Sequence, residues 1–109
     1  MTMKKRIEDC IVDTVCGCYG VSPDEMRSTC RRQKIGVARK MLAYLLYRYT
    51  PHNHQWIGLF LRRSSRFASE GIAQTQWEIE HIRSVKENYE YIIDNLKLTK
   101  EDEVNRKNH

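Results

Sequence analysis

The 109-residue sequence has few of the features that build large enzymes, membrane proteins or secreted proteins. It has two prolines and five dispersed glycines, so neither a glycine-rich phosphate loop nor a flexible linker can be recognised. No apolar run approaches the ~18–20 residues of a membrane span, and the mean hydropathy is −0.69. The N-terminus lacks the apolar segment of a secretory signal. We therefore expect one cytoplasmic domain that does not enter a membrane.

Catalytic and metal-binding constellations are also missing. The four cysteines include one close pair, Cys16 and Cys18, but no second pair completes a structural zinc site. In a reducing cytoplasm we expect all four to be buried or half-buried thiols. Serines, histidines and carboxylates do not combine into a nucleophile with its base or into an acid–base pair. The sequence therefore predicts no enzyme, no cofactor and no metal.

Acidic residues are absent from the middle of the chain. From Met26 to Ser69 there are ten basic residues and no acidic one, whereas the segments before and after carry net charges of −2 and −3. The ten are Arg27, Arg31, Arg32, Lys34, Arg39, Lys40, Arg48, Arg62, Arg63 and Arg66. A block of a single sign predicts an anionic partner, although the same pattern also describes a solvated basic surface.

Apolar residues recur at helical spacing throughout, and strand-like alternation is not seen. The first expected helix carries the stripe Ile7, Ile11, Val15 and Cys18, and a short second one is opened by Ser22-Pro23-Asp24-Glu25. A central helix is expected over about Gln33–Tyr49, followed by a short one over about Asn53–Leu61. A fifth helix has Ser65 or Ser69 as its N-cap, and a sixth is opened by Ser84-Val85-Lys86-Glu87. Residues 98–109 are polar and charged, which predicts a disordered tail after a domain spanning 1–97. The sequence thus predicts an all-α bundle of five or six helices.

The basic residues fall at two turns of this bundle. Arg31, Arg32 and Lys34 lie in the loop before the central helix and in its first turn, and a second group lies between the fourth and fifth helices. A short helix, a polar turn and a second helix describe a helix-turn-helix, whose second helix enters the DNA major groove with its N-terminal end. We expect base or backbone contacts there from Arg62, Arg63, Ser65, Arg66, Ser69 and Gln74. The sequence therefore predicts double-stranded DNA as the partner.

Several stretches of the chain also resemble a known family. They are Tyr19-Gly20-Val21-Ser22-Pro23-Asp24-Glu25-Met26-Arg27-Ser28, Arg31-Arg32-Gln33-Lys34-Ile35, Val37-Ala38-Arg39-Lys40, Tyr44-Leu45, Ile57-Gly58 with Phe60, Ile79-Glu80 with Ile82, and the stripe from Tyr89 to Leu96. Over about residues 7–97 they are similar to the C-terminal DNA-binding domain, domain IV, of the bacterial replication initiator DnaA. The resemblance implies an all-α fold with a Trp-repressor-like helix-turn-helix and a function in replication initiation or its regulation.

The resemblance is uneven over the predicted DNA contacts. The family's basic loop is retained as Arg31, Arg32, Lys34 and Arg39, which implies that these residues hold the DNA backbone. The family's Gly-Gly-Arg-Asp-His-Ser/Thr-Ser/Thr-Val run, which opens the recognition helix and reads bases, is missing from Leu61 to Ile72. Because the chain begins at Met1 and has no room for the initiator's ATPase module, we expect either a stand-alone relative or one domain of a longer protein.

A second hypothesis follows from the missing run. The chain would then be a protein-interaction module that kept the fold and lost sequence-specific DNA reading, with a replication protein as its candidate partner. Exposed candidates for such a contact are Phe67, Trp77 and Tyr91, although Trp77 is alternatively expected to pack on the sixth helix. The target sequence and the oligomeric state stay open at this point.

Overall fold

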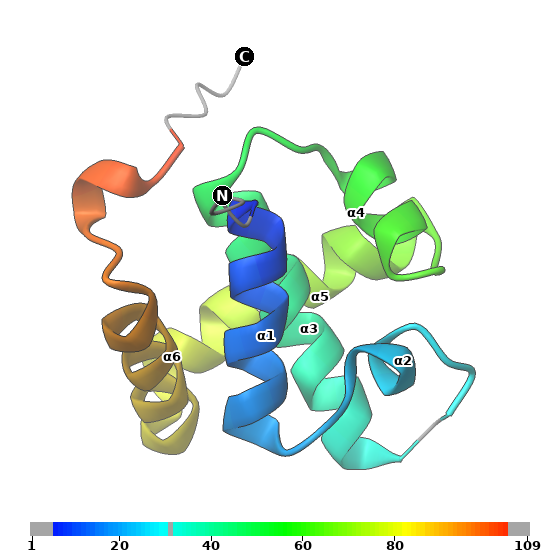
Figure 1. Cartoon of the computed structure of the whole chain (residues 1–109), viewed down its shortest axis with the longest axis horizontal. Coiled ribbons are helices and arrows are strands. Elements are labelled where there is room, and N and C mark those ends of the chain that lie inside the picture. Colours follow the sequence, from blue (N-terminus) through cyan, green and yellow to red (C-terminus); the bar gives the residue numbers. More distant parts are fainter. Residues whose placement is uncertain (1–5, 31, 105–109) are drawn as a thin grey trace, which may run out of the picture.

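A computed structural model describes residues 6–30 and 32–104. These residues form α1 (Ile7–Tyr19), α2 (Pro23–Met26), α3 (Gln33–Tyr49), α4 (His54–Phe60), α5 (Ser65–His81), α6 (Arg83–Leu96) and a 3-10 helix, η1 (Lys100–Asp102). The described part of the chain contains no strand, so the predicted all-α fold is confirmed (Figure 1). None of its helices is long and apolar enough to cross a membrane.

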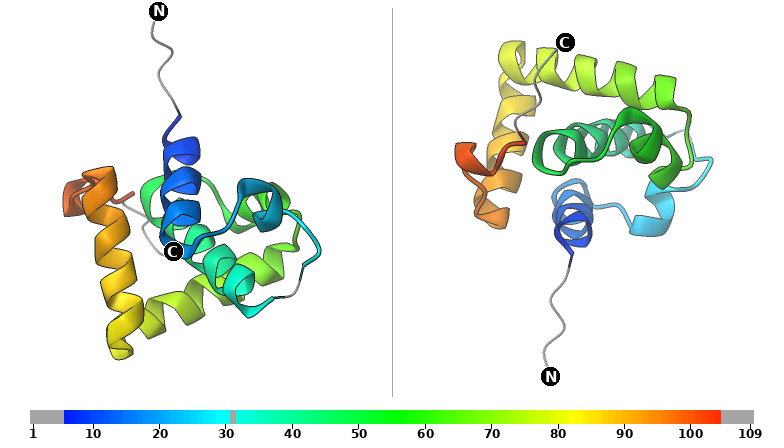
Figure 2. Two further views of the ribbon diagram at one scale, coloured as in Figure 1. Left: turned by 60° about the horizontal axis from the view of Figure 1, so that its bottom comes forward. Right: turned by 90° about the horizontal axis from the view of Figure 1, so that it is seen from above.

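Helix α3 is the centre of the bundle and has the bounds that its apolar pattern predicts. Viewed along α3, α5 lies on one side of it and α1 on the other (Figure 2). Helix α3 therefore packs against α5 and against α1. Its fully buried side chains include Ile35, Met41, Leu42, Leu45 and Leu46. The helix ends at Thr50, whose hydroxyl bonds back to the Leu46 carbonyl, and Pro51 prevents its continuation.

The segment between α1 and α3 follows the local sequence signals closely. Gly20 ends α1 in the left-handed region, at φ 66°. Ser22 then caps α2: its hydroxyl accepts from the Glu25 backbone N–H at 3.1 Å, while the Glu25 carboxylate accepts from the Ser22 backbone N–H at 2.9 Å. Both the C-cap and the capping box are thus as predicted.

The starts of the last two α-helices differ from the prediction. Ser64, and neither Ser65 nor Ser69, is the N-cap of α5, because the chain leaves α4 and re-enters helical geometry within the four residues 61–64. Helix α6 begins at Arg83, so Ser84 lies inside its first turn and cannot cap it. The break is made by the extended backbone of Ile82, which sends α6 back beside α1 (Figure 2).

The beginning of the predicted tail is ordered. Leu98 packs against the core, and η1 follows with Thr99 and Asp102 bonded to each other. The Val104 N–H then donates to the Arg48 carbonyl at 2.8 Å, and Arg48 pairs with Glu103 at 2.7 Å. Residues 98–104 therefore cover the end of α3, because that helix end offers an unpaired carbonyl and a cation. Residues 105–109 lie outside the described residues.

The cysteines are free thiols in the packed structure, as expected. Cys16 is buried and the other three are half-buried. Burial raises the pKa of Cys16 to about 11, so this thiol stays protonated at neutral pH.

Candidate nucleic-acid interface

Helices α4 and α5 are joined by a turn that allows very close approach of two backbone segments. A Cβ atom placed on Gly58 would lie 2.6 Å from the Ser64 carbonyl oxygen and 3.0 Å from that of Arg63. The Arg63 N–H donates to the Gly58 carbonyl at 2.7 Å, which fixes the turn from inside. Arg62 completes the reversal with a φ of 56°, in the left-handed region. The result is a compact helix-turn-helix.

Helix α5 has one face in the core and one in solvent. Ala68, Gly71, Ile72 and Thr75 are its buried residues, and a Cβ on Gly71 would lie 3.3 Å from the Lys40 side chain of α3. Three residues predicted as DNA contacts, Ser65, Arg66 and Ser69, are exposed on the first turns of the helix. The structure therefore places these three together at the end of α5 that enters the groove in helix-turn-helix proteins.

Two of the polar side chains of α5 are engaged with other charged groups. The Arg66 Nε lies 3.1 Å from the Glu70 carboxylate, one turn further along the helix, and both side chains are more than two-thirds exposed. The Gln74 side chain accepts from Lys40 Nζ and donates to Glu78, both at 3.0 Å. Gln74 is thus held between α3 and the acidic part of α5, whereas the exposed Arg66 pair is weak and exchanges readily with solvent ions.

The loop before α3 carries the second basic group. Lys34 is exposed in the first turn of α3. The Arg32 side chain is 69% exposed and its Nη2 lies 2.8 Å from the Glu25 carboxylate. Hydrogen bonding to Arg32 also lowers the pKa of the neighbouring Cys30 thiol. Arg31, the first of the predicted loop residues, lies outside the described residues.

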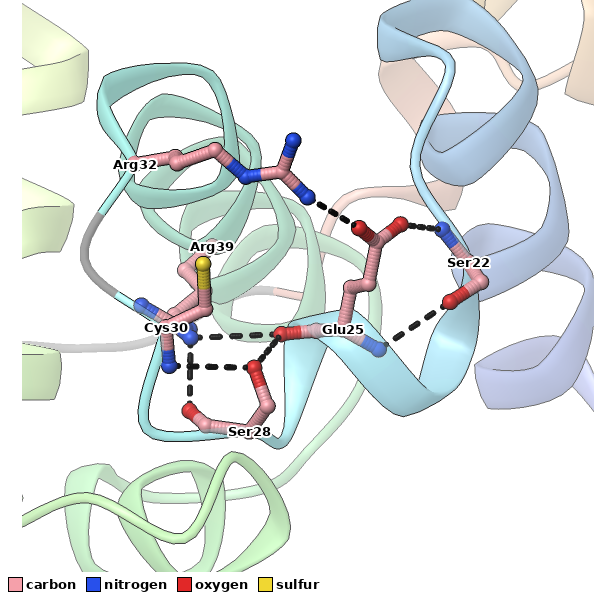
Figure 3. A network of polar contacts seen from close by, with 6 residues as sticks. All are labelled: Ser22, Glu25, Ser28, Cys30, Arg32 and Arg39. Atoms are coloured by element: carbon pink, nitrogen blue, oxygen red, sulfur yellow. Dashed lines mark hydrogen bonds and ion pairs between the residues drawn. The ribbon is translucent and has the colours of Figure 1, made fainter.

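Arg39 does not belong to the DNA-contacting surface that the sequence predicted. It is only 4% exposed, and its guanidinium donates to the Met26 carbonyl at 2.8 Å. It also donates to the carbonyls of Ser28 at 2.6 Å and Glu25 at 3.2 Å (Figure 3). These carbonyls belong to the end of α2 and the loop after it. The buried guanidinium thus gives these carbonyls a charged donor, in addition to the Ser28 N–H and hydroxyl that donate to the Glu25 carbonyl. Arg39 therefore shapes the loop from inside.

The carbonyl of Ser28 connects the loop to the helix-turn-helix. It accepts from Arg39 Nη2 and also, at 2.7 Å, from Arg63 Nη2 in the turn between α4 and α5. Arg63 is half-buried as a result, whereas Arg62 beside it is exposed. The two predicted basic groups are thus parts of one frame, in which Arg32, Lys34, Arg62 and Arg66 have exposed side chains.

Sequence reasoning missed several residues around this frame. Glu70 was not expected beside Arg66, although a spacing of four residues on one helix indicates such a pair. The Arg27 guanidinium lies over the Phe60 ring at 4.3 Å and joins α2 to α4. Leu59 on α4 is 77% exposed. The Arg27 contact has no local sequence signal, because it depends on how α4 docks, whereas the exposure of Leu59 is consistent with the helical spacing of the buried Ile57 and Leu61.

The aromatic residues considered for a protein contact are not equivalent. Phe67 is partly buried against the core, so its expected exposure is wrong. Trp77 is 55% exposed and its ring stacks on His81 of the same helix, with ring centres 4.2 Å apart. Tyr91 is 56% exposed. Trp77 is therefore exposed, as the protein-contact hypothesis expected, and its ring packs along its own helix.

The fold and this frame define an all-α protein with a helix-turn-helix and a basic loop beside its turn. The family described as the bacterial DnaA protein helix-turn-helix matches residues 8–68, from α1 to the first turn of α5. This is more than half of the chain, so the chain belongs to that family, as the sequence resemblance indicated. The chromosomal replication initiator protein DnaA of Kosmotoga olearia is 43% identical over 46 residues, which are 42% of this chain and 10% of that relative.

Proposed function

We propose that this protein binds double-stranded DNA through its helix-turn-helix and basic loop, and that it acts in replication initiation or its regulation. The observation that carries the proposal is the shared Ser28 carbonyl, which joins the loop and the α4–α5 turn into one basic surface. A duplex offers phosphates on both sides of a groove, and a surface with cations on both the loop and the turn can contact several of them at once. The family membership and the DnaA relative support the same function.

The exposed side chains divide between two roles. Arg32 and Lys34, together with Arg31 of the same loop, hold phosphates or reach the adjacent minor groove. Arg62 and Arg63 lie within the turn and contribute further phosphate contacts. Ser65, Arg66 and Ser69 approach base edges, where arginine can bind guanine through two hydrogen bonds. Gln74 reaches a base only by exchanging its bonds to Lys40 and Glu78.

A salt titration on a mixed-sequence duplex tests the proposal. If about six phosphates are neutralised, the logarithm of the binding constant falls against the logarithm of salt concentration with a slope of about −5. Replacing Arg31 and Arg32 with alanine lowers affinity for all sequences alike and flattens the slope by about two. Arg83→Ala, an exposed arginine at the start of α6, is the matched control and leaves the slope unchanged. No binding at low ionic strength would refute DNA binding.

Selection from a random duplex library then tests whether sequence is read. An enriched motif shows specific recognition, and a palindromic motif indicates that the protein binds as a dimer. Arg66→Ala is expected to relax discrimination at one position by about 1–3 kcal/mol, provided that Arg66 contacts a base. Uniform weakening across all sequences would instead assign Arg66 to the backbone.

The exposed Trp77 and Tyr91 favour a second candidate function, binding to a replication protein. Under this alternative, replacing both with alanine abolishes capture of that protein and leaves duplex binding unchanged. Capture that persists after nuclease treatment supports a direct protein contact, and capture that disappears shows that DNA bridges the two.

A further inference from the structure

Leu59 is an unusual side chain on the short helix α4. It is 77% exposed, more than Trp77 and Tyr91, which are 55% and 56% exposed. Ile57 and Leu61 of the same segment are fully buried, so Leu59 lies on the side of α4 that faces solvent and away from the core. A single exposed leucine is common on protein surfaces and is not by itself evidence of a contact. The exposure of Leu59 is therefore interpreted from the residues that surround it.

Leu59 lines an open hollow of about 310 Å³ beside the turn of the helix-turn-helix. The other lining residues are Gln55, Arg63, Ser64 and Ser65. Ser64 and Ser65 are the N-cap and the first residue of α5. The hollow is therefore directly at the N-terminal end of the helix that enters the major groove in this architecture.

The charges around the hollow favour a nucleic acid over a protein as its occupant. Arg63 lines it, Arg62 is exposed within the turn, and Arg66 is exposed in the first turn of α5. The nearest acidic residue on α5, Glu70, is already paired with Arg66. An exposed apolar side chain in a hollow that an arginine also lines is complementary to a ligand that displays an apolar group beside phosphates.

We propose that Leu59 contacts the C5-methyl group of a thymine in the major groove and so selects thymine at that position. The inference rests on the proposed DNA binding and adds to it a base preference. Among the groups that bases display in the major groove, the C5-methyl group of thymine is the apolar one. Apolar side chains are its usual contacts. The contact removes both the methyl group and the leucine from water, which neither cytosine nor a purine at that position repeats.

Deoxyuridine provides the test, because it differs from thymidine only by this methyl group. The probe is the duplex enriched by selection, prepared with thymine and with uracil at each thymine position in turn. Wild-type protein is expected to bind about fourfold more weakly when the critical thymine is replaced, the size expected for one buried methyl group. Leu59→Ala is expected to lose a similar factor on the thymine duplex and to bind thymine and uracil duplexes equally.

The controls separate this inference from the proposed function. Tyr91→Ala removes another exposed large side chain, from α6, and is expected to retain the full thymine preference. Because Leu59 is so exposed, its alanine variant is expected to unfold at the wild-type temperature, which circular dichroism verifies. Uracil binding equal to thymine at every position, or a Leu59→Ala variant that keeps the preference, overturns the inference while DNA binding stands. Absence of any duplex binding overturns the proposed function itself.

Discussion

Gly58 supports a prediction in which two effects of opposite sign compete. It lies inside α4, where replacing glycine by alanine ordinarily stabilises a helix by about 1 kcal/mol. At this position, however, the added Cβ would lie 2.6 Å from the Ser64 carbonyl oxygen and 2.8 Å from the Ser64 carbonyl carbon. These are backbone atoms of the turn, and they cannot move aside as the end of a flexible side chain would.

The steric effect is the larger of the two. Forcing one extra carbon into a well-packed site costs about 1–3 kcal/mol. Moving Ser64 away also weakens the 2.7 Å hydrogen bond from the Arg63 N–H to the Gly58 carbonyl, worth about 1 kcal/mol. After subtraction of the helix-propensity gain, we expect Gly58→Ala to lower the free energy of unfolding by about 2 kcal/mol. The melting temperature should fall by about 8–16 °C for a domain of this size.

Gly17 supplies the matched control. It lies inside α1, and a Cβ on it would have no neighbour within 4 Å. Gly17→Ala should therefore raise the free energy of unfolding by about 1 kcal/mol. Urea unfolding followed by circular dichroism measures both variants against wild type. If Gly58→Ala were as stable as wild type while Gly17→Ala showed the expected gain, the close approach of α4 to the turn would be refuted.

Three further predictions concern charged side chains. Arg39→Met is expected to lower the free energy of unfolding by about 3 kcal/mol in urea, because three carbonyls lose a buried charged donor; a loss below about 1 kcal/mol would contradict this role. Arg62→Gly is expected to raise that free energy by about 1 kcal/mol by relieving the left-handed backbone, while weakening duplex binding; a fall in stability would argue against the strain. Glu8 accepts a hydrogen bond from His52, which lowers the pKa of its carboxyl below 4.5; the stabilisation is therefore present above that pH and is lost as the pH falls through the lowered pKa. Glu8→Gln should consequently be less stable than wild type at pH 6 and equal to it at pH 2, and an equal difference at both would show that the Glu8 charge does not stabilise the fold.

The fold was predictable where its signals are local. The bounds of α3 follow from an apolar face that covers most of the helix, and the start of α2 follows from a capping box within four residues. The start of α6 was not predictable, because Ile82 breaks the helix through its backbone conformation and without a capping side chain. An isoleucine between two helical stretches carries no turn signal of its own.

In the candidate site, too, features with a local sequence signal were predictable and features that depend on the folded structure were not. The exposure of Arg66 and Ser69 follows from helical periodicity, since Ala68 and Ile72 occupy the opposite face of α5. The burial of Arg39 depends on carbonyls 11 to 14 residues earlier in the chain, which approach only after the loop has folded over α3. A run of basic residues therefore indicated the right region of the molecule but could not separate the arginines that face solvent from the one that builds the loop.

The Ser28 carbonyl has a consequence for the thermodynamics of association. By accepting from both Arg39 and Arg63, it orders the loop and the α4–α5 turn together while the chain folds. Backbone ordering costs about 1–2 kcal/mol of conformational entropy per residue, and here that cost is included in the folding reaction. A ligand that spans both segments meets a surface already in place, so little chain entropy is lost on binding. Affinity is then set by desolvation and by whatever deformation the ligand itself undergoes.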